Sequence, residues 1–213
     1  MISGWRKEEM SLMARMTVAW DCGHRACRRG DSRGPTPTFL RRGSGPLDKR
    51  ALPGGQVILV RTASPEDRNR LRRMFSMLSP TSIYQRFHSP IPRVPEWAVT
   101  RAVEVDHHDE ESLVAVVEGE IVGQAMYVRL ASGDEAEAAV VVEDGWQRRG
   151  VGKLLMSRLA ERARHRGIAA LTGAVLPENV AMRGLMTAHG GLRYSSEDGA
   201  FLARVPLHST SPE

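Results

Sequence analysis

The chain has 213 residues, of which 41% are hydrophobic and 26% charged, as is typical of a globular domain with an appendage. No apolar run approaches the roughly 18 residues that cross a bilayer, and the N-terminal residues lack the apolar stretch of a secretory signal. We therefore expect no membrane partner and a cytoplasmic location. Two cysteines, Cys22 and Cys27, are too few for a disulfide framework, which agrees with a reducing compartment.

The net charge of +5 is unevenly distributed. Residues 1–55 hold eleven Lys and Arg against five Asp and Glu, a net +6, whereas residues 56–213 hold nineteen against twenty, a net −1. The first segment lacks hydrophobic periodicity and is rich in Arg, Gly and Pro, so we predict a basic, mostly disordered N-terminal extension over 1–55. Nucleic-acid contact is expected only through this extension. Cys22, His24 and Cys27 lack the second pair of ligands that zinc needs, which argues against a metal site.

From residue 56 onward the sequence alternates between strand and helix signals. Hydrophobic periodicity and capping residues predict strands over 57–60, 113–117, 121–130, 135–143, 169–176 and 200–205, and helices over 64–78, 79–87, 96–103, 150–166 and 179–189. The unbroken apolar run 138–142 favours a central strand covered on both faces. The order of elements predicts one α/β domain over 56–206 with a mixed sheet, followed by a short tail over 207–213.

A glycine-containing loop joins the central strand to the next helix. Gly150 and Gly152 lack Cβ atoms, so the backbone there can approach a ligand closely. The first-turn N–H groups of a helix have no partner within it, and the helix dipole adds about half a positive charge, so we expect a pyrophosphate at this position. Arg148, Arg149 and Lys153 supply further positive charge. The absence of Gly-Lys-Ser/Thr excludes a Walker loop, and the position after a hairpin disfavours a dinucleotide fold.

The pattern Gln147-x-x-Gly150-x-Gly152 after an apolar strand resembles the acetyl-CoA-binding motif of the GCN5-related N-acetyltransferase (GNAT) superfamily. The resemblance covers 57–205 and includes Asn179, which matches the family's Asn-containing helix; Leu192 replaces the usual aromatic residue in the turn after that helix. It implies a GNAT fold with a mostly antiparallel sheet, acetyl-CoA as cosubstrate and no metal. It also implies that strand backbone holds the pantetheine, that the loop holds the pyrophosphate, and that one side chain binds near the rest of the cofactor. The residues implied are Val140 and Val142 for the strand; Gln147, Arg148, Arg149, Gly150, Val151, Gly152 and Lys153 for the loop; and Asn179.

A narrower likeness concerns the acceptor. The segment Leu78-Ser79-Pro80-x-Ser82-x-Tyr84-x-Arg86-Phe87, with Val105-Asp106 and Leu113-Val114-Ala115, resembles the acetyltransferase domain of bacterial protein lysine acetyltransferases (Pat-like). This likeness implies a protein substrate with an accessible lysine, and acetyl-CoA synthetase-like enzymes among the expected partners. Acetylation of a small amine or of a peptide N-terminus is an alternative, as is a non-catalytic acyl-CoA-binding module.

Acetyl transfer to a lysine needs a base, because a lysine amine with a pKa near 10.4 is almost fully protonated at neutral pH. Glu137 directly precedes the apolar run, and by strand alternation it shares a face with Ala139 and Val141. The resemblance to the lysine-acetylating branch implies that Glu137 is the general base. Glu135, on the same face, is the second candidate. Many relatives carry a tyrosine acid where this chain has Met186, so the group that protonates the thiolate is left open.

Other polar and aromatic residues receive structural interpretations. His189 precedes Gly-Gly and is interpreted as a helix C-terminal group. The pair His107-His108 lies beside acidic residues and is interpreted as a solvated turn rather than a metal site. We expect residues 84–87 to shape the acceptor side by packing, Trp146 to cover apolar surface beside the loop, and a backbone N–H near Val142 to polarise the thioester carbonyl.

Overall fold

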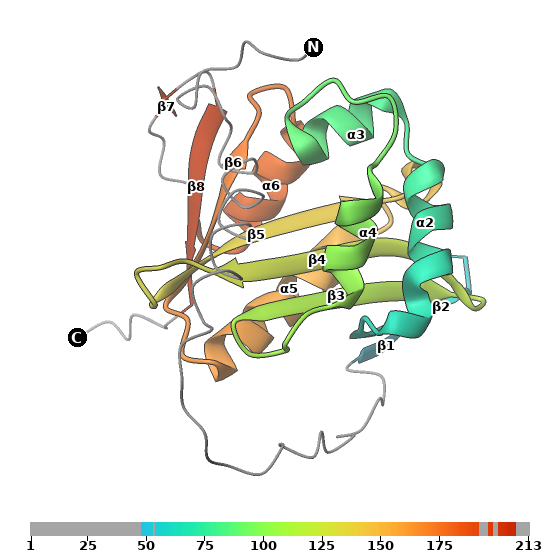
Figure 1. Cartoon of the computed structure of the whole chain (residues 1–213), viewed down its shortest axis with the longest axis horizontal. Helices are drawn as coiled ribbons and strands as arrows, with labels where there is room; N and C mark the ends of the chain where they lie inside the picture. The colour runs from blue at the N-terminus through green and yellow to red at the C-terminus, as the bar shows by residue number, and fades with distance from the viewer. Residues whose placement is uncertain (1–47, 53, 192–195, 198–199, 208–213) are drawn as a thin grey trace, which may run out of the picture. The chain divides into compact units, whose positions relative to one another are not determined.

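The computed structural model describes residues 48–52, 54–191, 196–197 and 200–207. They form one eight-stranded sheet in the spatial order β1-β2-β3-β4-β5-β6-β8-β7 (Figure 1). The strands are β1 (Asp48–Ala51), β2 (Val57–Thr62), β3 (Glu110–Val117), β4 (Glu120–Arg129), β5 (Glu135–Val142), β6 (Ala170–Val175), β7 (Ser196–Glu197) and β8 (Ala200–Pro206). Only the β5–β6 pair is parallel within this sheet. The prediction of a mixed, mostly antiparallel sheet is confirmed.

Helices cover both faces of the sheet, with α5 behind it and α2 and α4 in front in Figure 1. The helices are α2 (Arg68–Ser76), α3 (Pro80–Phe87), α4 (Glu96–Val103), α5 (Val151–His165) and α6 (Val180–Ala188), with 3-10 turns η1 (Pro65–Asp67) and η2 (Asp144–Trp146). The helix predicted over 64–78 is thus a 3-10 turn followed by α2. Within the described ranges, no helix combines the length and apolar content that a membrane crossing requires.

The alternation of side chains along β5 divides them between two apolar cores. Ala136 and Ala138 pack in the core that contains Leu155 of α5. Val141 packs in the core that contains Phe75 of α2 and the apolar faces of α3 and α4. The apolar run is therefore covered on both faces, as predicted, because each face of this central strand meets a different helix layer.

The strand β1 lies inside the segment predicted to be disordered, so that prediction is wrong for residues 48–51. These residues pair with β2, and the following Leu52 is only 6% exposed in the α5 core. Asp48 also accepts two hydrogen bonds from Arg158 of α5, at 2.8 and 3.0 Å. The composition of residues 1–55 as a whole did not indicate this strand, because the strand is stabilised by contacts with distant residues, mainly the Asp48–Arg158 ion pair and the burial of Leu52. Residues 1–47 of the extension, with Cys22 and Cys27, lie outside the described residues, as do Leu192 and the tail from 208.

Two truncations test the contribution of β1. Deleting residues 1–43 retains every strand that the structure describes and is expected to leave the melting temperature unchanged. Deleting residues 1–55 removes β1 and Leu52, whose burial contributes about 1.5–3 kcal/mol, and is expected to lower the melting temperature by roughly 5 °C or more. Differential scanning calorimetry of the two truncated chains makes the comparison. Equal melting temperatures would mean that β1 adds nothing to the stability of the domain.

Candidate active site

The central feature of the site is a fork between β5 and β6. Register pairs between these strands end at Glu137↔Thr172, whereas β5 stays paired with β4 as far as Gly123↔Val142. Beyond Glu137 the side of β5 that faces β6 therefore carries no ladder among the described residues. We call this place the β5–β6 fork.

The direction of the β5 peptide groups follows from one hydrogen bond. The Glu143 N–H donates to the Val122 carbonyl of β4 at 2.9 Å. Successive residues of a strand turn their peptide groups to opposite sides, so those of Val140 and Val142 point away from β4, into the fork. An extended ligand could pair with them as an added strand does.

The loop after η2 presents unbonded N–H groups at the start of α5. Arg148 and Gly150 have positive φ of 59° and 87°, backbone conformations of the kind found in anion-binding turns. The first intrahelical bond runs from Leu154 N–H to the Gly150 carbonyl at 3.0 Å, and no side chain caps the helix. The N–H groups of residues 151–153 precede that bond. Such N–H groups at a helix N-terminus fit a pyrophosphate.

The space around Gly152 supports a ligand-facing position. A Cβ atom there would meet only Val142 Cγ2 at 3.7 Å and Leu185 Cδ2 at 3.9 Å, which are ordinary contacts. Packing inside the protein therefore does not require glycine, and close approach of a ligand gives a reason for it. The Arg149 guanidinium lies over the Trp146 ring, 4.9 Å from its centroid, and Trp146 packs against the α5 core as predicted.

Two residues of the predicted cofactor set bond within the protein. The side-chain amide of Gln147 donates to Ser82 Oγ at 3.0 Å and to the Val142 carbonyl at 3.1 Å. Asn179 is the N-cap of α6, where its Oδ1 accepts from the Met182 N–H at 3.0 Å. Both side chains therefore shape the backbone around the site.

Glu137 lies at the fork itself and is only 2% exposed. Its side chain shares a strand face with Val141, so it points towards the layer of α2, α3 and α4. Its Oε1 atom has no hydrogen-bond partner among the described residues. Burial raises the pKa of Glu137, and the nearby Arg86 of α3 and Arg101 of α4 oppose this rise. The net result is a carboxyl with a raised pKa, an arrangement typical of a general base.

Arg86 of α3 is a partly buried cation close to Glu137. Burial lowers the pKa of Arg86 to about 10, partly offset by the negative charge of Glu137. The Arg86 guanidinium lies 4.9 Å from the centroid of the Phe87 ring, and that ring meets Trp97 edge-on at 6.2 Å. The end of α3 thus places one cation, Arg86, near the Glu137 carboxyl, and aromatic rings of α3 and α4 pack on one another behind it.

Comparisons with known proteins agree with this geometry. The model of the Acetyltransferase (GNAT) family matches residues 71–190. Acetyltransferase PA5475 of Pseudomonas aeruginosa is 30% identical over 163 residues, which are 74% of this chain and 88% of that protein. The chain belongs to the GNAT acetyltransferase family.

Two further relatives of this GNAT chain extend the comparison. Acetyltransferase Pat of Mycolicibacterium smegmatis is 30% identical over 72% of this chain, and the chain spans 46% of that protein's length. The crystal structure of the GNAT domain of S. lividans PAT is 32% identical, with a TM-score of 0.70 over 75% of this chain and 96% of that one. These relatives confirm the GNAT fold and an acyl-CoA-dependent N-acetyltransferase.

Other candidate residues of the GNAT domain have structural partners. Glu135 forms an ion pair with Arg204 of β8 at 2.7 Å. His189 ends α6, where its Nδ1 lies 2.8 Å from the Leu185 carbonyl, in agreement with its interpretation as a helix C-terminal group. Met186 is fully buried in the α5 core, so it fills space at the position of the tyrosine acid.

The histidine pair also has local partners. His107 Nδ1 lies 2.7 Å from Glu111 Oε1, and His108 Nδ1 lies 3.0 Å from Asp109 Oδ1. The described part of the chain contains no group of three His, Cys, Asp or Glu side chains suited to a metal ion.

Sequence reasoning missed Asp144, the first residue of η2. Its carboxylate accepts from Ser79 N–H at 2.9 Å, Ser79 Oγ at 2.7 Å and Ser82 Oγ at 2.9 Å. Burial by itself would raise the pKa of Asp144, but the bonds from the two serines outweigh it, and the net pKa lies below its ordinary value. The sequence signal nearest to it is the Ser79-Pro80-x-Ser82 start of α3, which by itself indicates only the beginning of a helix.

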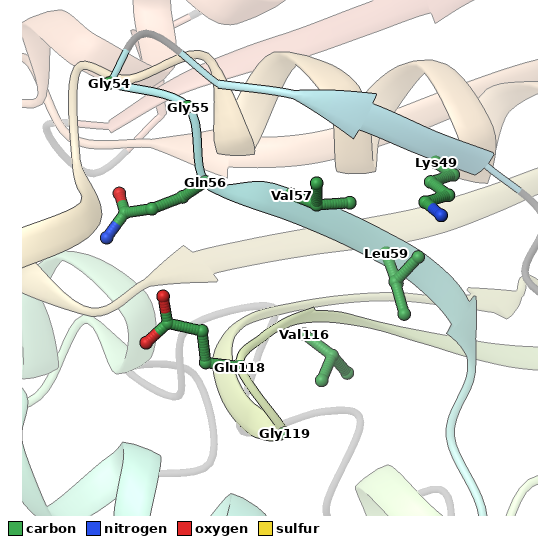
Figure 2. Close-up of a pocket in the computed structure, with 9 residues that line it drawn as sticks. All are labelled: Lys49, Gly54, Gly55, Gln56, Val57, Leu59, Val116, Glu118 and Gly119. Atoms are coloured by element: carbon green, nitrogen blue, oxygen red, sulfur yellow. The ribbon is translucent and has the colours of Figure 1, made fainter.

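A pocket of about 630 Å³ lies away from the fork, beside β1 and the β3–β4 turn. Figure 2 shows Gln56 and Glu118 at one end of it and Lys49 at the other, with apolar side chains of β2 and β3 between them. Its lining shares no residue with the fork or with the loop before α5. The pocket is therefore separate from the candidate cofactor site.

Proposed function

We propose that this chain transfers the acetyl group of acetyl-CoA to a lysine side chain of a protein substrate, with Glu137 as general base. The observation that carries the proposal is the buried Glu137 carboxyl at the point where β5 leaves β6, with Oε1 unpaired among the described residues. A buried carboxyl oxygen without a hydrogen-bond partner costs folding free energy. Its retention there is best explained by a catalytic task.

The donor side uses the backbone of the fork and the loop. Val140 and Val142 would pair with the pantetheine, and the N–H groups from Arg148 to Lys153 would bind the pyrophosphate. Arg148 and Lys153 are exposed and would add positive charge, and Asn179 would contact the cofactor from the start of α6. Acetyl-CoA supplies the activated acetyl group as a thioester.

The chemistry assigned to Glu137 is proton removal. Glu137 takes a proton from the lysine ammonium, and the neutral amine attacks the thioester carbonyl carbon to form a C–N bond. A backbone N–H near Val142 stabilises the negative oxygen. The nitrogen of the tetrahedral intermediate then loses its extra proton to water, and the intermediate expels the CoA thiolate as the C–S bond breaks. Because Met186 occupies the position of the usual acid, the thiolate receives its proton from water.

The choice of a lysine acceptor rests on two observations. First, two of the relatives are named Pat or PAT, and the Pat-like segment from Leu78 to Phe87 comprises the link that follows α2 and all of α3. Secondly, the raised pKa of Glu137 brings it closer to that of an ammonium, which favours proton transfer from a basic amine. An acceptor of low pKa would need no such base.

Replacement of the proposed base tests the function directly. We expect Glu137→Gln to lower kcat by roughly 100-fold or more, because the isosteric amide cannot accept the proton. Glu135→Gln is the matched control, since it removes only a partly exposed ion pair, and it is expected to retain most activity. Mass spectrometry of lysine peptides and of peptides with only an α-amine, each incubated with acetyl-CoA, measures rate and site. Transfer to α-amines alone, or full activity of Glu137→Gln, contradicts the proposal.

The pH dependence of the reaction follows from the environment of Glu137. Only the ionised carboxylate accepts a proton, and the pKa of Glu137 is raised, so kcat/KM for the acceptor should fall on the acid side above the ordinary pKa of a glutamate. Arg86 and Arg101 are the cations that oppose the rise. Arg86→Met should therefore move the acid limb to higher pH, whereas Arg86→Lys keeps the charge and should leave it nearer to wild type. Identical acid limbs in all three proteins would exclude Arg86 as an influence on the base.

The proposed pyrophosphate site predicts a specific effect of Gly152→Ala. The added Cβ meets only ordinary contacts within the protein, so the melting temperature should not fall. The methyl group would occupy space that the ligand needs, and the Kd for acetyl-CoA should rise by about tenfold, or 1.4 kcal/mol. Isothermal titration calorimetry measures both variants, with Gly184→Ala in α6 as control, because a Cβ there meets nothing within 4 Å. An unchanged Kd in Gly152→Ala would contradict the proposal that the pyrophosphate binds beside Gly152.

A further inference from the structure

The segment that follows β5 is bonded to the start of α3. Asp144 receives three hydrogen bonds from Ser79 and Ser82, which are 65 and 62 residues earlier in the chain. Ser79 is at the same time the N-cap of α3, where its Oγ accepts from the Ser82 N–H at 3.2 Å. The carboxylate thus holds the first turn of α3 from outside the helix. Within the described residues the Asp144 carboxylate forms no ion pair with a basic side chain, and its hydrogen bonds come from these two serines.

Gln147 continues the same network towards the cofactor side. Its amide nitrogen donates to Ser82 Oγ and to the Val142 carbonyl, whose peptide group points into the β5–β6 fork. We call this set of four residues (Ser79, Ser82, Asp144 and Gln147) the Asp144 clasp. It runs without interruption from the fork backbone, through the loop, to the N-terminus of α3.

We propose that Asp144 is a positioning residue that couples acyl-CoA binding at the fork and loop to the placement of α3 on the acceptor side. The inference rests on the proposed function, because α3 carries Arg86 beside the proposed base Glu137. A ligand that pairs with the fork backbone and binds at the loop would restrict the motion of Val142 and Gln147. Through the hydrogen bonds of the clasp, the first turn of α3 would then also become less mobile. Two turns later the same helix presents Arg86 to Glu137.

The clasp differs from an ordinary cap in where it connects. Asp67 makes a similar set of bonds at η1, where its Oδ2 accepts from Ser64 N–H at 3.0 Å and from Ser64 Oγ at 3.3 Å. That cluster closes on the nearby Arg61. It has no bond to the loop before α5, so it provides an internal comparison with the same serine–aspartate chemistry but without the connection.

The experiment compares Asp144→Ala and Ser82→Ala with Ser64→Ala as matched control. Amide hydrogen exchange of residues 80–87 is measured in the full chain with and without saturating acetyl-CoA. In wild type and Ser64→Ala, acetyl-CoA should slow this exchange several-fold, whereas in Asp144→Ala and Ser82→Ala the slowing should be absent or much smaller. At saturating acetyl-CoA, kcat/KM for the acceptor should fall about tenfold in Asp144→Ala and stay near wild type in Ser64→Ala.

Two results overturn the inference. One is a wild-type chain that binds acetyl-CoA with no change in exchange over 80–87. The other is that acetyl-CoA slows amide exchange of residues 80–87 equally in Asp144→Ala and in wild type. The clasp would then act only as a cap of α3. Failure of the proposed function is distinguishable, because a chain that binds acetyl-CoA but acetylates no lysine refutes the acceptor assignment while the exchange measurement still decides the coupling.

Discussion

The site depends on one constraint, the end of β5–β6 pairing at Glu137. Had the parallel ladder continued, the peptide groups of Val140 and Val142 would be satisfied within the sheet and unable to bind a ligand. Because the ladder stops, the last residues of β5 pair with β4 only and leave their other edge without a strand partner among the described residues. The same stop places the Glu137 carboxyl at the point of divergence. A single change of pairing therefore creates both a surface for the donor and the position of the proposed base.

An exposed backbone edge in the middle of a sheet must be kept in place by other contacts. The residues directly after β5 provide these contacts. Glu143 Oε2 forms an ion pair with Nη1 of Arg73 in α2 at 2.8 Å, and the Asp144 carboxylate accepts a hydrogen bond from Ser79 at the start of α3. These contacts join the end of β5 to the helix layer on the acceptor side. On the opposite face α5 packs against β3, β4 and β5 through its apolar residues. The edge is thus open to a ligand without being loose.

Hydrophobic periodicity and capping residues predicted most helices and strands, but they could not predict contacts between residues far apart in the sequence. The Pro95-Glu96 start and the apolar period of α4 gave a predicted helix over 96–103, and the observed helix is Glu96–Val103. Strand alternation placed Glu137 on the face of Val141. The fork could not be predicted, since periodicity does not show where two strands separate. Asp144 was missed for a similar reason, because an exposed acid has no periodic signal and its partners lie more than 60 residues away.

The electrostatics of Glu137 link these observations. Burial under the acceptor-side layer raises its pKa, while Arg86 and Arg101 from that layer lower it. Both opposing effects therefore depend on where α3 and α4 lie, and a shift of α3 would change desolvation and charge together. The balance matters for a base, since too low a pKa weakens proton abstraction and too high a pKa leaves the carboxyl protonated. The bonds from Ser79 and Ser82 to Asp144 fix the first turn of the helix that carries Arg86, and under the proposed coupling they would help to keep that balance.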